Sequence, residues 1–287
     1  MIIFSFKEDF RDKHCIPDSS FYLEGGENLC FLIHGLTGTP KEMSTLGSRL
    51  HDSGYAVAVP LLLGHNGPLS VLKRQKWQEI YARVKEEYLK YEAGYKNIFI
   101  AGLSFGALLG LLLSLDFPKK IRGVVCISPT LFFDGWSTPK SRFLLPMVYR
   151  TPFKYNFYFK EEYPYGIKNE RLRARIDRYY TKAKLDDYSQ VHLYGYPVIP
   201  ISCMEQNELL ARHIISLLPK IDAPLQLLQA RDDDITSPRN SYEIYNNAGS
   251  VDKELVFFED SYHIITSDQE RDKASEKITS FFNKHKA

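Results

Sequence analysis

The feature that most constrains this chain is a glycine-flanked serine between two apolar runs. Residues 97–101 are suited to a buried strand, and residues 105–115 to a buried helix. Between them lies Gly102-Leu103-Ser104-Phe105-Gly106, whose glycines remove side chains that would collide in a sharp turn. Such a strand–turn–helix unit predicts that the oxygen of Ser104 is held clear of the backbone, near the positive end of the helix dipole.

The rest of the chain alternates strand-like and helical segments joined by short connections. Strand-like runs recur at residues 21–23, 29–34, 55–60, 97–102, 123–128, 225–230 and 255–258. Helical periodicity lies between or after them, at residues 40–53, 77–91, 105–115 and 267–284. Thr39 and Glu42 are expected to form a capping box at the first of these helices. The alternation predicts a mostly parallel central sheet flanked by helices on both faces.

This alternation is interrupted between residues 129 and 210. Pro, Tyr and Phe are dense there, strand-length apolar runs disappear, and residues 171–185 and 202–218 have helical periodicity. We therefore predict a core domain made of residues 1–128 and 211–287, with a helical lid inserted at residues 129–210. The 287 residues are enough for one large α/β domain with a sizeable core.

Composition and charge argue against several classes of protein. The net charge of +2 does not indicate nucleic acid or an acidic membrane as a partner. The longest apolar run, residues 107–113, is too short to span a bilayer, and the apolar start at residues 1–6 is too short for a secretory signal. The four cysteines form no CxxC pair, so we expect free thiols and a cytoplasmic location.

A second motif, His34-Gly35-Leu36-Thr37-Gly38, follows an early strand. Attack by a serine on a carbonyl carbon creates an oxyanion, which requires backbone N–H donors that are already aimed at it. One donor is expected from Phe105, the residue after the serine, and the second from Leu36 in this loop. His34 is interpreted as a brace for the loop and not as a catalytic base.

The acid and the base that activate such a serine must follow it in the chain. The histidines after the serine are His192, His213, His263 and His285. His263 follows the strand at residues 255–258, at the sheet edge from which a base can reach Ser104. An acid that orients its ring is expected within Asp232-Asp233-Asp234, directly after the strand at residues 225–230, and spacing alone does not choose among the three.

Together these motifs resemble those of bacterial carboxylesterases and monoacylglycerol lipases, which are α/β-hydrolases. The resemblance rests on residues 32–38, 64–65, 101–106, 229–233 and 261–263, spread over the predicted core. The family pattern Ala-Arg-x-Asp implies that Asp233 is the acid of a Ser104–His263–Asp233 triad. Two positions depart from the pattern: Tyr262 stands where glycine is usual, and Asn66 interrupts a Gly-His-Gly sequence.

The resemblance implies hydrolysis of carboxylic esters through an acyl-enzyme, with neither metal nor organic cofactor. The aromatic-rich lid favours an apolar acyl chain, and the candidate substrate contacts are Gly35, Thr37 and Tyr262. A thioesterase or methyl esterase that acts on a carrier-bound acyl group would use the same triad. A binding protein without catalytic activity is the alternative from another class. Dehalogenation is disfavoured because it usually needs aspartate in place of Ser104.

The predicted lid is also basic. Residues 150–184 contain ten Lys or Arg against four Asp or Glu, and one helix carries Arg171, Arg173, Arg175 and Arg178. The simplest interpretation is a solvated helix face, and the alternative is contact with an acidic acyl carrier or with acidic lipid headgroups. The expected partners are therefore a small ester and, at this helix, an acidic carrier or headgroup.

Overall fold

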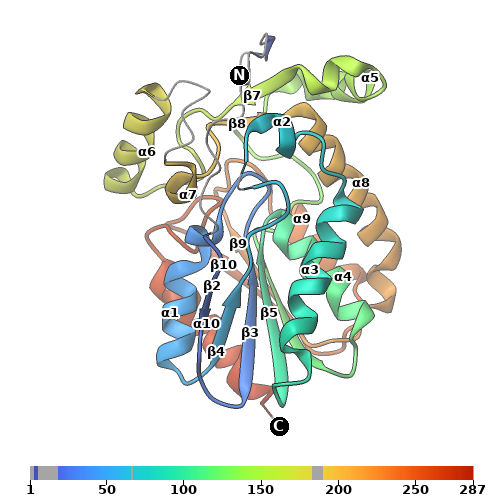
Figure 1. Ribbon diagram of the computed structural model, residues 1–287, viewed down its shortest axis with the longest axis vertical. Helices are drawn as coiled ribbons and strands as arrows, with labels where there is room; N and C mark the ends of the chain where they lie inside the picture. The colour runs from blue at the N-terminus through green and yellow to red at the C-terminus, as the bar shows by residue number, and fades with distance from the viewer. Residues whose placement is uncertain (1–2, 6–18, 66, 183–189, 287) are drawn as a thin grey trace.

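The computed structural model describes residues 3–5, 19–65, 67–182 and 190–286 of the chain. Its centre is a seven-stranded sheet in the order β10-β9-β6-β5-β3-β4-β2 (Figure 1). Every neighbouring pair is parallel except the edge pair β2–β4, so the prediction of a mostly parallel sheet is confirmed. The strands are β2 (Phe21–Leu23), β3 (Asn28–Ile33), β4 (Ala56–Val59), β5 (Asn97–Leu103), β6 (Ile121–Ile127), β9 (Leu225–Ala230) and β10 (Lys253–Phe258).

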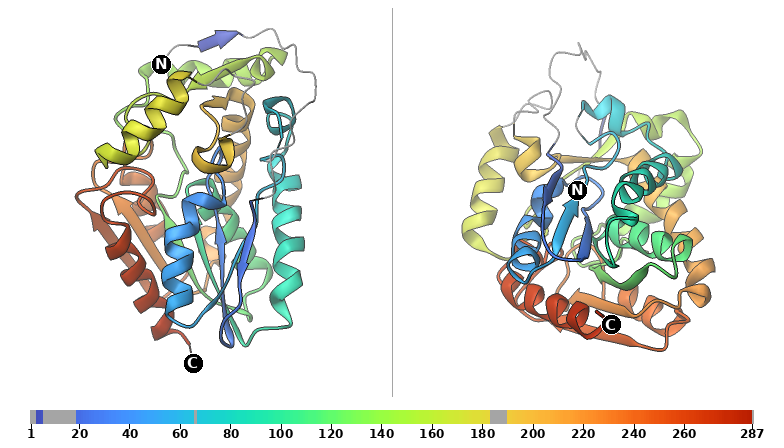
Figure 2. Two further views of the ribbon diagram at one scale, coloured as in Figure 1. Left: turned by 60° about the vertical axis from the view of Figure 1, so that its left-hand side comes forward. Right: turned by 60° about the horizontal axis from the view of Figure 1, so that its bottom comes forward.

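Helices cover both faces of this sheet, which explains why its central strands are apolar on both sides. Helices α1 (Ser44–Asp52) and α10 (Arg271–Lys284) pack together on one face, over Leu32 and Phe99. Helices α3 (Trp77–Glu92), α4 (Phe105–Asp116) and α8 (Ile201–Leu217) cover the other face, over Phe31 and Ile100. Figure 2 shows α1 and α10 on one side of the sheet and α3 on the other.

The segment from residue 129 to residue 210 lies mostly beyond the carboxyl ends of the strands (Figure 1). It contains α5 (Leu145–Tyr149), β7 (Phe157–Lys160), α6 (Glu170–Lys182), α7 (Val191–Tyr194) and β8 (Val198–Pro200). Strand β1 (Ile3–Ser5) pairs antiparallel with β7, so a strand from the start of the chain joins this upper layer. Helix α8 begins in the upper layer and continues along α4, across residue 210. The division into core and lid domains stays a prediction.

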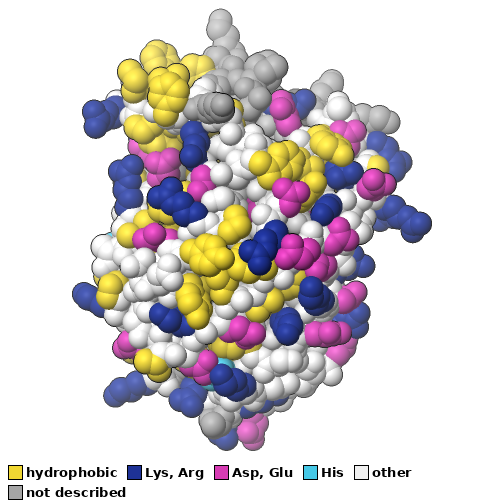
Figure 3. All heavy atoms as spheres, turned by 180° about the vertical axis from the view of Figure 1, so that it is seen from behind, with side chains coloured by type: hydrophobic (Ala, Val, Ile, Leu, Met, Phe, Trp, Pro, Cys, Tyr) yellow, Lys and Arg dark blue, Asp and Glu magenta, His cyan; other side chains and the backbone are white. Residues whose placement is uncertain are grey.

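Shorter elements connect these parts. They are the 3₁₀ turns η1 (Pro40–Met43), η2 (Lys140–Leu144), η3 (Pro152–Tyr155) and η4 (Leu218–Lys220), and the helices α2 (Leu69–Leu72) and α9 (Arg239–Asn247). Exposed apolar side chains gather around α5, among them Phe143, Met147 and Phe153. Figure 3, which shows the molecule from behind, has hydrophobic atoms at its upper left, where α5 lies. Patches of this kind occur where proteins contact lipid or other proteins.

Two helix starts differ from the sequence prediction. The prediction of a capping box was wrong. Thr39 Oγ1 donates instead to the carbonyl of His192, and the carboxylate of Glu42 accepts from the N–H of Gly35. The last helix begins at Arg271, since the carboxylate of Asp268 accepts four backbone N–H groups and holds the preceding residues in a loop. Residues 183–185 of the helix predicted at 171–185 lie outside the described residues.

Two further sequence expectations concern thiols and membrane spans. Cys30, Cys126 and Cys203 are buried free thiols, as predicted, and Cys15 lies outside the described residues. In the parts of the chain that the structure describes, no helix combines the length and apolarity needed to cross a membrane.

Candidate active site

Ser104 occupies the turn between β5 and α4. Its backbone has φ 57° and ψ −114°, a conformation that is uncommon for a residue with a side chain. A Cβ atom on Gly106 would collide with the carbonyl of Ile33, and one on Gly102 would collide with the carbonyl of Gly106. The two glycines therefore allow strand and helix to approach closely, so that the tight turn presents Ser104 at the start of α4.

His263 and Asp233 form a buried pair close to this turn. The Nδ1 atom of His263 lies 3.0 Å from Oδ2 and 3.1 Å from Oδ1 of Asp233. The carboxylate is held in place by N–H groups of Ile235 and Thr236, at 2.9 and 2.8 Å, and by the amide of Gln229 at 3.0 Å. A carboxylate fixed in this way can orient an imidazole ring and stabilise its protonated form.

The neighbouring aspartates face other groups. Asp232 is exposed, whereas Asp234 is buried and accepts from the N–H of Gly166 at 3.0 Å and of His263 at 3.4 Å. Burial and the adjacent charge of Asp233 raise the pKa of Asp234 to about 6. Of the three aspartates, only Asp233 is hydrogen-bonded to Nδ1 of His263. Asp233 is also the residue that the family pattern implies as the acid.

The loop at residues 34–38 lies directly beside Ser104, because a Cβ atom on Gly35 would be 3.7 Å from the Cβ of Ser104. The ring of His34 accepts from the N–H of Leu62 through Nε2 and bonds the carbonyl of Gly35 through Nδ1. Burial lowers the pKa of His34 well below its usual value, so the ring is neutral. These contacts support the interpretation of His34 as a brace.

Two side chains that were not expected to contact this loop, His65 and Glu42, also brace it. The Nε2 atom of His65 lies 2.6 Å from the carbonyl oxygen of Leu36. A carboxylate oxygen of Glu42 accepts from the N–H of Gly35 at 3.1 Å. The Gly64-His65 motif was a signal for the first contact, while the second depends on the unforeseen 3₁₀ turn at Pro40.

Ser104 and His263 border one small cavity of about 80 Å³. The predicted contacts Gly35 and Thr37 also line it, as does Leu36. Tyr262 is not among the lining residues, because its ring packs 5.7 Å from the ring of Trp136, with Lys168 above it. The remaining walls are mostly apolar or aromatic: Leu103, Phe133, Tyr165, Ile176, Tyr180, Tyr194, Ile199, Ile235 and Ile264.

The two predicted oxyanion donors differ in how their N–H groups are placed. Phe105 is the first residue of α4, so its N–H has no acceptor within the helix. Leu36 lies in the braced loop that borders the cavity. Both positions are therefore compatible with donation to an oxyanion next to Ser104.

Thr130 is a contact of Ser104 that sequence reasoning missed. Its Oγ1 atom lies 2.7 Å from Oγ of Ser104, and its carbonyl accepts from the side-chain amide of Asn207 at 2.9 Å. The serine oxygen is therefore hydrogen-bonded to Thr130 in this structure, while His263 lines the same cavity. No sequence motif marks Thr130, which the fold brings to the serine from the end of β6.

Two carboxylates, Glu42 and Glu161, also border the cavity. Burial raises the pKa of each to about 7, so each carries a proton for part of the time near neutral pH. Among the described residues, no group of three His, Cys, Asp or Glu side chains is arranged to hold a metal ion.

A parallel sheet with a serine at a sharp strand-to-helix turn, followed in the chain by aspartate and then histidine, defines the α/β-hydrolase class. This chain belongs to the Hydrolase_4 family, described as serine aminopeptidase, S33, whose model matches residues 26–270. It is a serine hydrolase of the esterase/lipase family.

Its relatives match along most of their length. The chain is 26% identical to a carboxylesterase of Bacillus subtilis, with 94% of this chain and 98% of the relative covered. It is also 26% identical to a thermostable monoacylglycerol lipase of Bacillus sp. strain H-257, with 92% and 94% covered. A solved structure from work on the metagenome-derived lipolytic enzymes LipS and LipT superimposes with a TM-score of 0.78 at 25% identity, covering 95% and 100%.

Proposed function

We propose that this protein hydrolyses carboxylic esters that have an apolar acyl chain. Ser104 is the nucleophile, His263 the general base and Asp233 the acid that orients it. The observation that carries the proposal is the buried His263–Asp233 pair, at 3.0 Å, with His263 and Ser104 on the same cavity. The relatives named as a carboxylesterase and as a monoacylglycerol lipase support the same class of substrate.

The mechanism follows from these positions. The Ser104 hydroxyl first leaves its hydrogen bond with Thr130 and forms one with Nε2 of His263. It then gives its proton to that nitrogen, and the serine oxygen attacks the ester carbonyl carbon. The N–H groups of Leu36 and Phe105 hold the oxyanion. The alcohol leaves with the proton from His263, and water then hydrolyses the acyl-enzyme by the same route.

The lining of the cavity supports an apolar acyl chain. Its walls include Phe133, Ile199 and Ile235, and these three also border a second cavity of about 130 Å³. Hydrolysis of a carrier-bound thioester by the same residues is the second candidate function, favoured by the basic side chains of α6.

A series of p-nitrophenyl esters with acyl chains of increasing length tests this function. We expect turnover with an optimum at one chain length, because the walls around Ser104 leave little space and the cavity of about 80 Å³ must accept the acyl group. The measurement is kcat/KM for each ester, with the wild type compared with Ser104→Ala. A folded protein without turnover of any ester in the series would contradict the proposal.

The rate is expected to depend on the charge of His263. Burial lowers the pKa of this imidazole, but the charges of Asp233, Asp234 and Glu42 outweigh burial, and the net shift is upward. Only the neutral ring can accept the serine proton, so kcat/KM should rise with pH, with a midpoint above the usual value of about 6.5.

Removing the charge of one of these carboxylates tests whether it raises the pKa of His263. Glu42→Gln removes one negative charge near His263 and keeps an oxygen that can accept from Gly35. We expect the midpoint of the pH–rate profile to move to lower pH in this variant, while Glu276→Gln, on the exposed side of α10, leaves it in place. An unmoved or raised midpoint in Glu42→Gln would show that this charge does not act on the base.

A further inference from the structure

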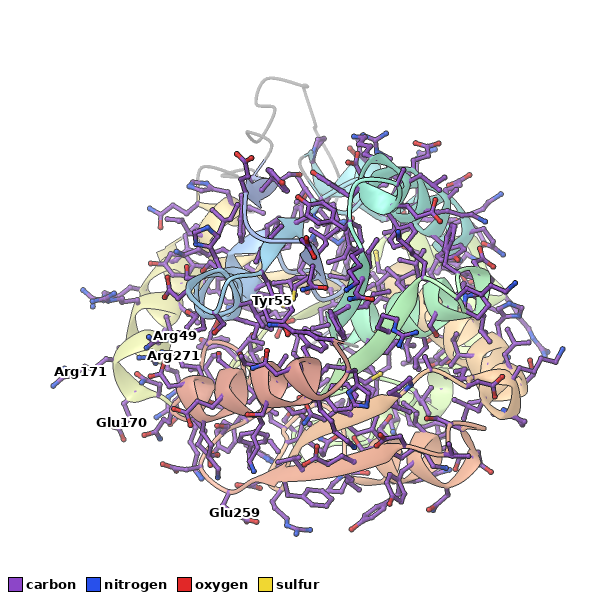
Figure 4. All side chains as sticks on the ribbon, turned by 90° about the horizontal axis from the view of Figure 1, so that it is seen from below. Arg49, Tyr55, Glu170, Arg171, Glu259 and Arg271 are labelled. Atoms are coloured by element: carbon purple, nitrogen blue, oxygen red, sulfur yellow. The ribbon has the colours of Figure 1, made fainter. Side chains whose placement is uncertain are left out.

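A groove lies beside the candidate active site, between α6 on one side and η1, α1 and α10 on the other. It encloses about 520 Å³, and its lining includes the apolar side chains Ile167, Leu172 and Leu193. Four cationic side chains also line it: Lys41, Arg171, Arg175 and Arg271. Figure 4 shows Arg171 and Arg271, from helices far apart in sequence, on the same side of the molecule.

These cations have no carboxylate partner among the described residues. Three of the carboxylates near them in sequence have other contacts or point to solvent. Asp272 pairs with Arg49 at 2.9 Å, and Asp268 accepts backbone N–H groups. Glu170 is almost fully exposed and lies 3.9 Å from Arg173. Among the described residues, four cations therefore line the groove against one carboxylate, Glu42, which leaves an excess of positive charge.

The structure also separates the four arginines that the sequence places together on one helix. Arg171 and Arg175 line the groove. Arg173 is turned inward, where it stacks on Tyr163 and lies near the carbonyls of Ile167 and Lys168. Arg178 lies outside the groove lining and donates to the carbonyl of Ala174 in its own helix.

The groove adjoins the catalytic cavity, because both are bordered by Glu42, Ile176, Tyr194 and Ile264. At about 80 Å³, the inner cavity is smaller than typical ligand pockets, which measure about 300–1,000 Å³. The groove, at about 520 Å³, falls within that range. A substrate larger than the inner cavity therefore needs further space, and the adjoining groove offers it.

Negative and positive charges occupy different positions between Ser104 and the groove. Glu42 stands where groove and cavity meet, and the cations lie on the groove side. When ionised, Glu42 repels an anion that approaches Ser104, whereas the cations attract an anion that remains outside. The path thus suits a substrate with a neutral ester next to Ser104 and an anionic group further out.

We propose that the physiological substrate is an ester or thioester with a phosphate or carboxylate group, which the groove of Lys41, Arg171, Arg175 and Arg271 binds. This inference rests on the proposed function, since it assigns a substrate class to the same site. The anionic group can belong to the alcohol or thiol part of the substrate or to the far end of its acyl chain.

Matched ester pairs test the inference and distinguish these two positions. Monohexanoylglycerol and its phosphate differ by an anion on the alcohol side. p-Nitrophenyl butyrate and the mono-p-nitrophenyl ester of glutaric acid differ by a carboxylate on the acyl side. The readout is the anion preference, defined as kcat/KM for the anionic ester divided by kcat/KM for its neutral partner. We expect a preference of about tenfold for at least one pair, which decreases as added salt screens the cations.

The double variant Arg171→Gln/Arg175→Gln is expected to lower that preference by about tenfold. Arg178→Gln removes one positive charge from the same helix outside the groove, and should leave the preference unchanged. A wild type without preference in either pair, or a preference that the double variant and Arg178→Gln change equally, would overturn the inference. Ser104-dependent turnover of the neutral esters would then still support the proposed function, whereas its absence for all four esters would contradict that function itself.

Discussion

Replacing Ser104 by alanine is expected to lower kcat for the best p-nitrophenyl ester by roughly 10⁵–10⁶-fold, as loss of the nucleophile does in other serine hydrolases. The variant loses the oxygen that attacks the carbonyl, while Leu36, Phe105 and the cavity walls remain. Alanine is smaller than serine, and the lost hydrogen bond to Thr130 is local, so the variant should fold. Steady-state hydrolysis, with circular dichroism as a check of folding, measures the effect.

Covalent labelling makes this prediction independent of the choice of ester. A fluorophosphonate should modify wild-type Ser104, and mass spectrometry of the labelled peptide identifies the site. The matched control is Ser48→Ala, which changes an exposed serine on α1 and should keep both labelling and turnover. Labelling of Ser104→Ala at the wild-type rate, or turnover within tenfold of the wild type, would show that Ser104 is not the nucleophile.

The second large effect is expected for Asp233→Asn, which should lower kcat by about 10⁴-fold. The carboxylate of Asp233 accepts a hydrogen bond from Nδ1–H of His263, which leaves Nε2 unprotonated and free to take the serine proton. An amide of the same shape can present its NH₂ group to Nδ1, which favours the wrong tautomer of the ring. The measurement is kcat at a pH well above the midpoint of the pH–rate profile.

The adjacent aspartates are the matched controls. Asp232→Asn changes an exposed side chain and should leave kcat unchanged. Asp234→Asn keeps an oxygen for the N–H groups of Gly166 and His263, so we expect a loss of less than about tenfold. If Asp234→Asn caused the larger loss and Asp233→Asn a small one, the assignment of the acid would be wrong.

The positions of the sheet strands were predictable because each central strand is buried on both faces. That burial requires a run of apolar residues such as residues 97–101, and such runs can be recognised in the amino-acid sequence. The turn at Ser104 was predictable for a similar reason, since only glycine fits where backbone atoms of Ile33 and Gly106 approach. The order of serine, aspartate and histidine narrowed the remaining choices to a few residues.

Contacts between distant segments could not be predicted in this way. The bond between Thr130 and Ser104 joins residues 26 positions apart, and that between Thr39 and His192 joins residues 153 apart. Tyr262 was expected in the pocket from its neighbour His263, but its ring packs on Trp136 instead. Local patterns identify the side chains that one segment offers, but not the segment that packs against them.

The sequence by itself determined the alternating architecture, the nucleophile turn and the histidine that follows the last strand. These depend on burial and on backbone geometry within short stretches of chain. Only the tertiary structure decided which arginines of α6 face the groove, and that Glu42 stands between the groove and the cavity. The reason is physical: the charge and shape of a pocket are sums over side chains from several elements, and folding alone brings those elements together.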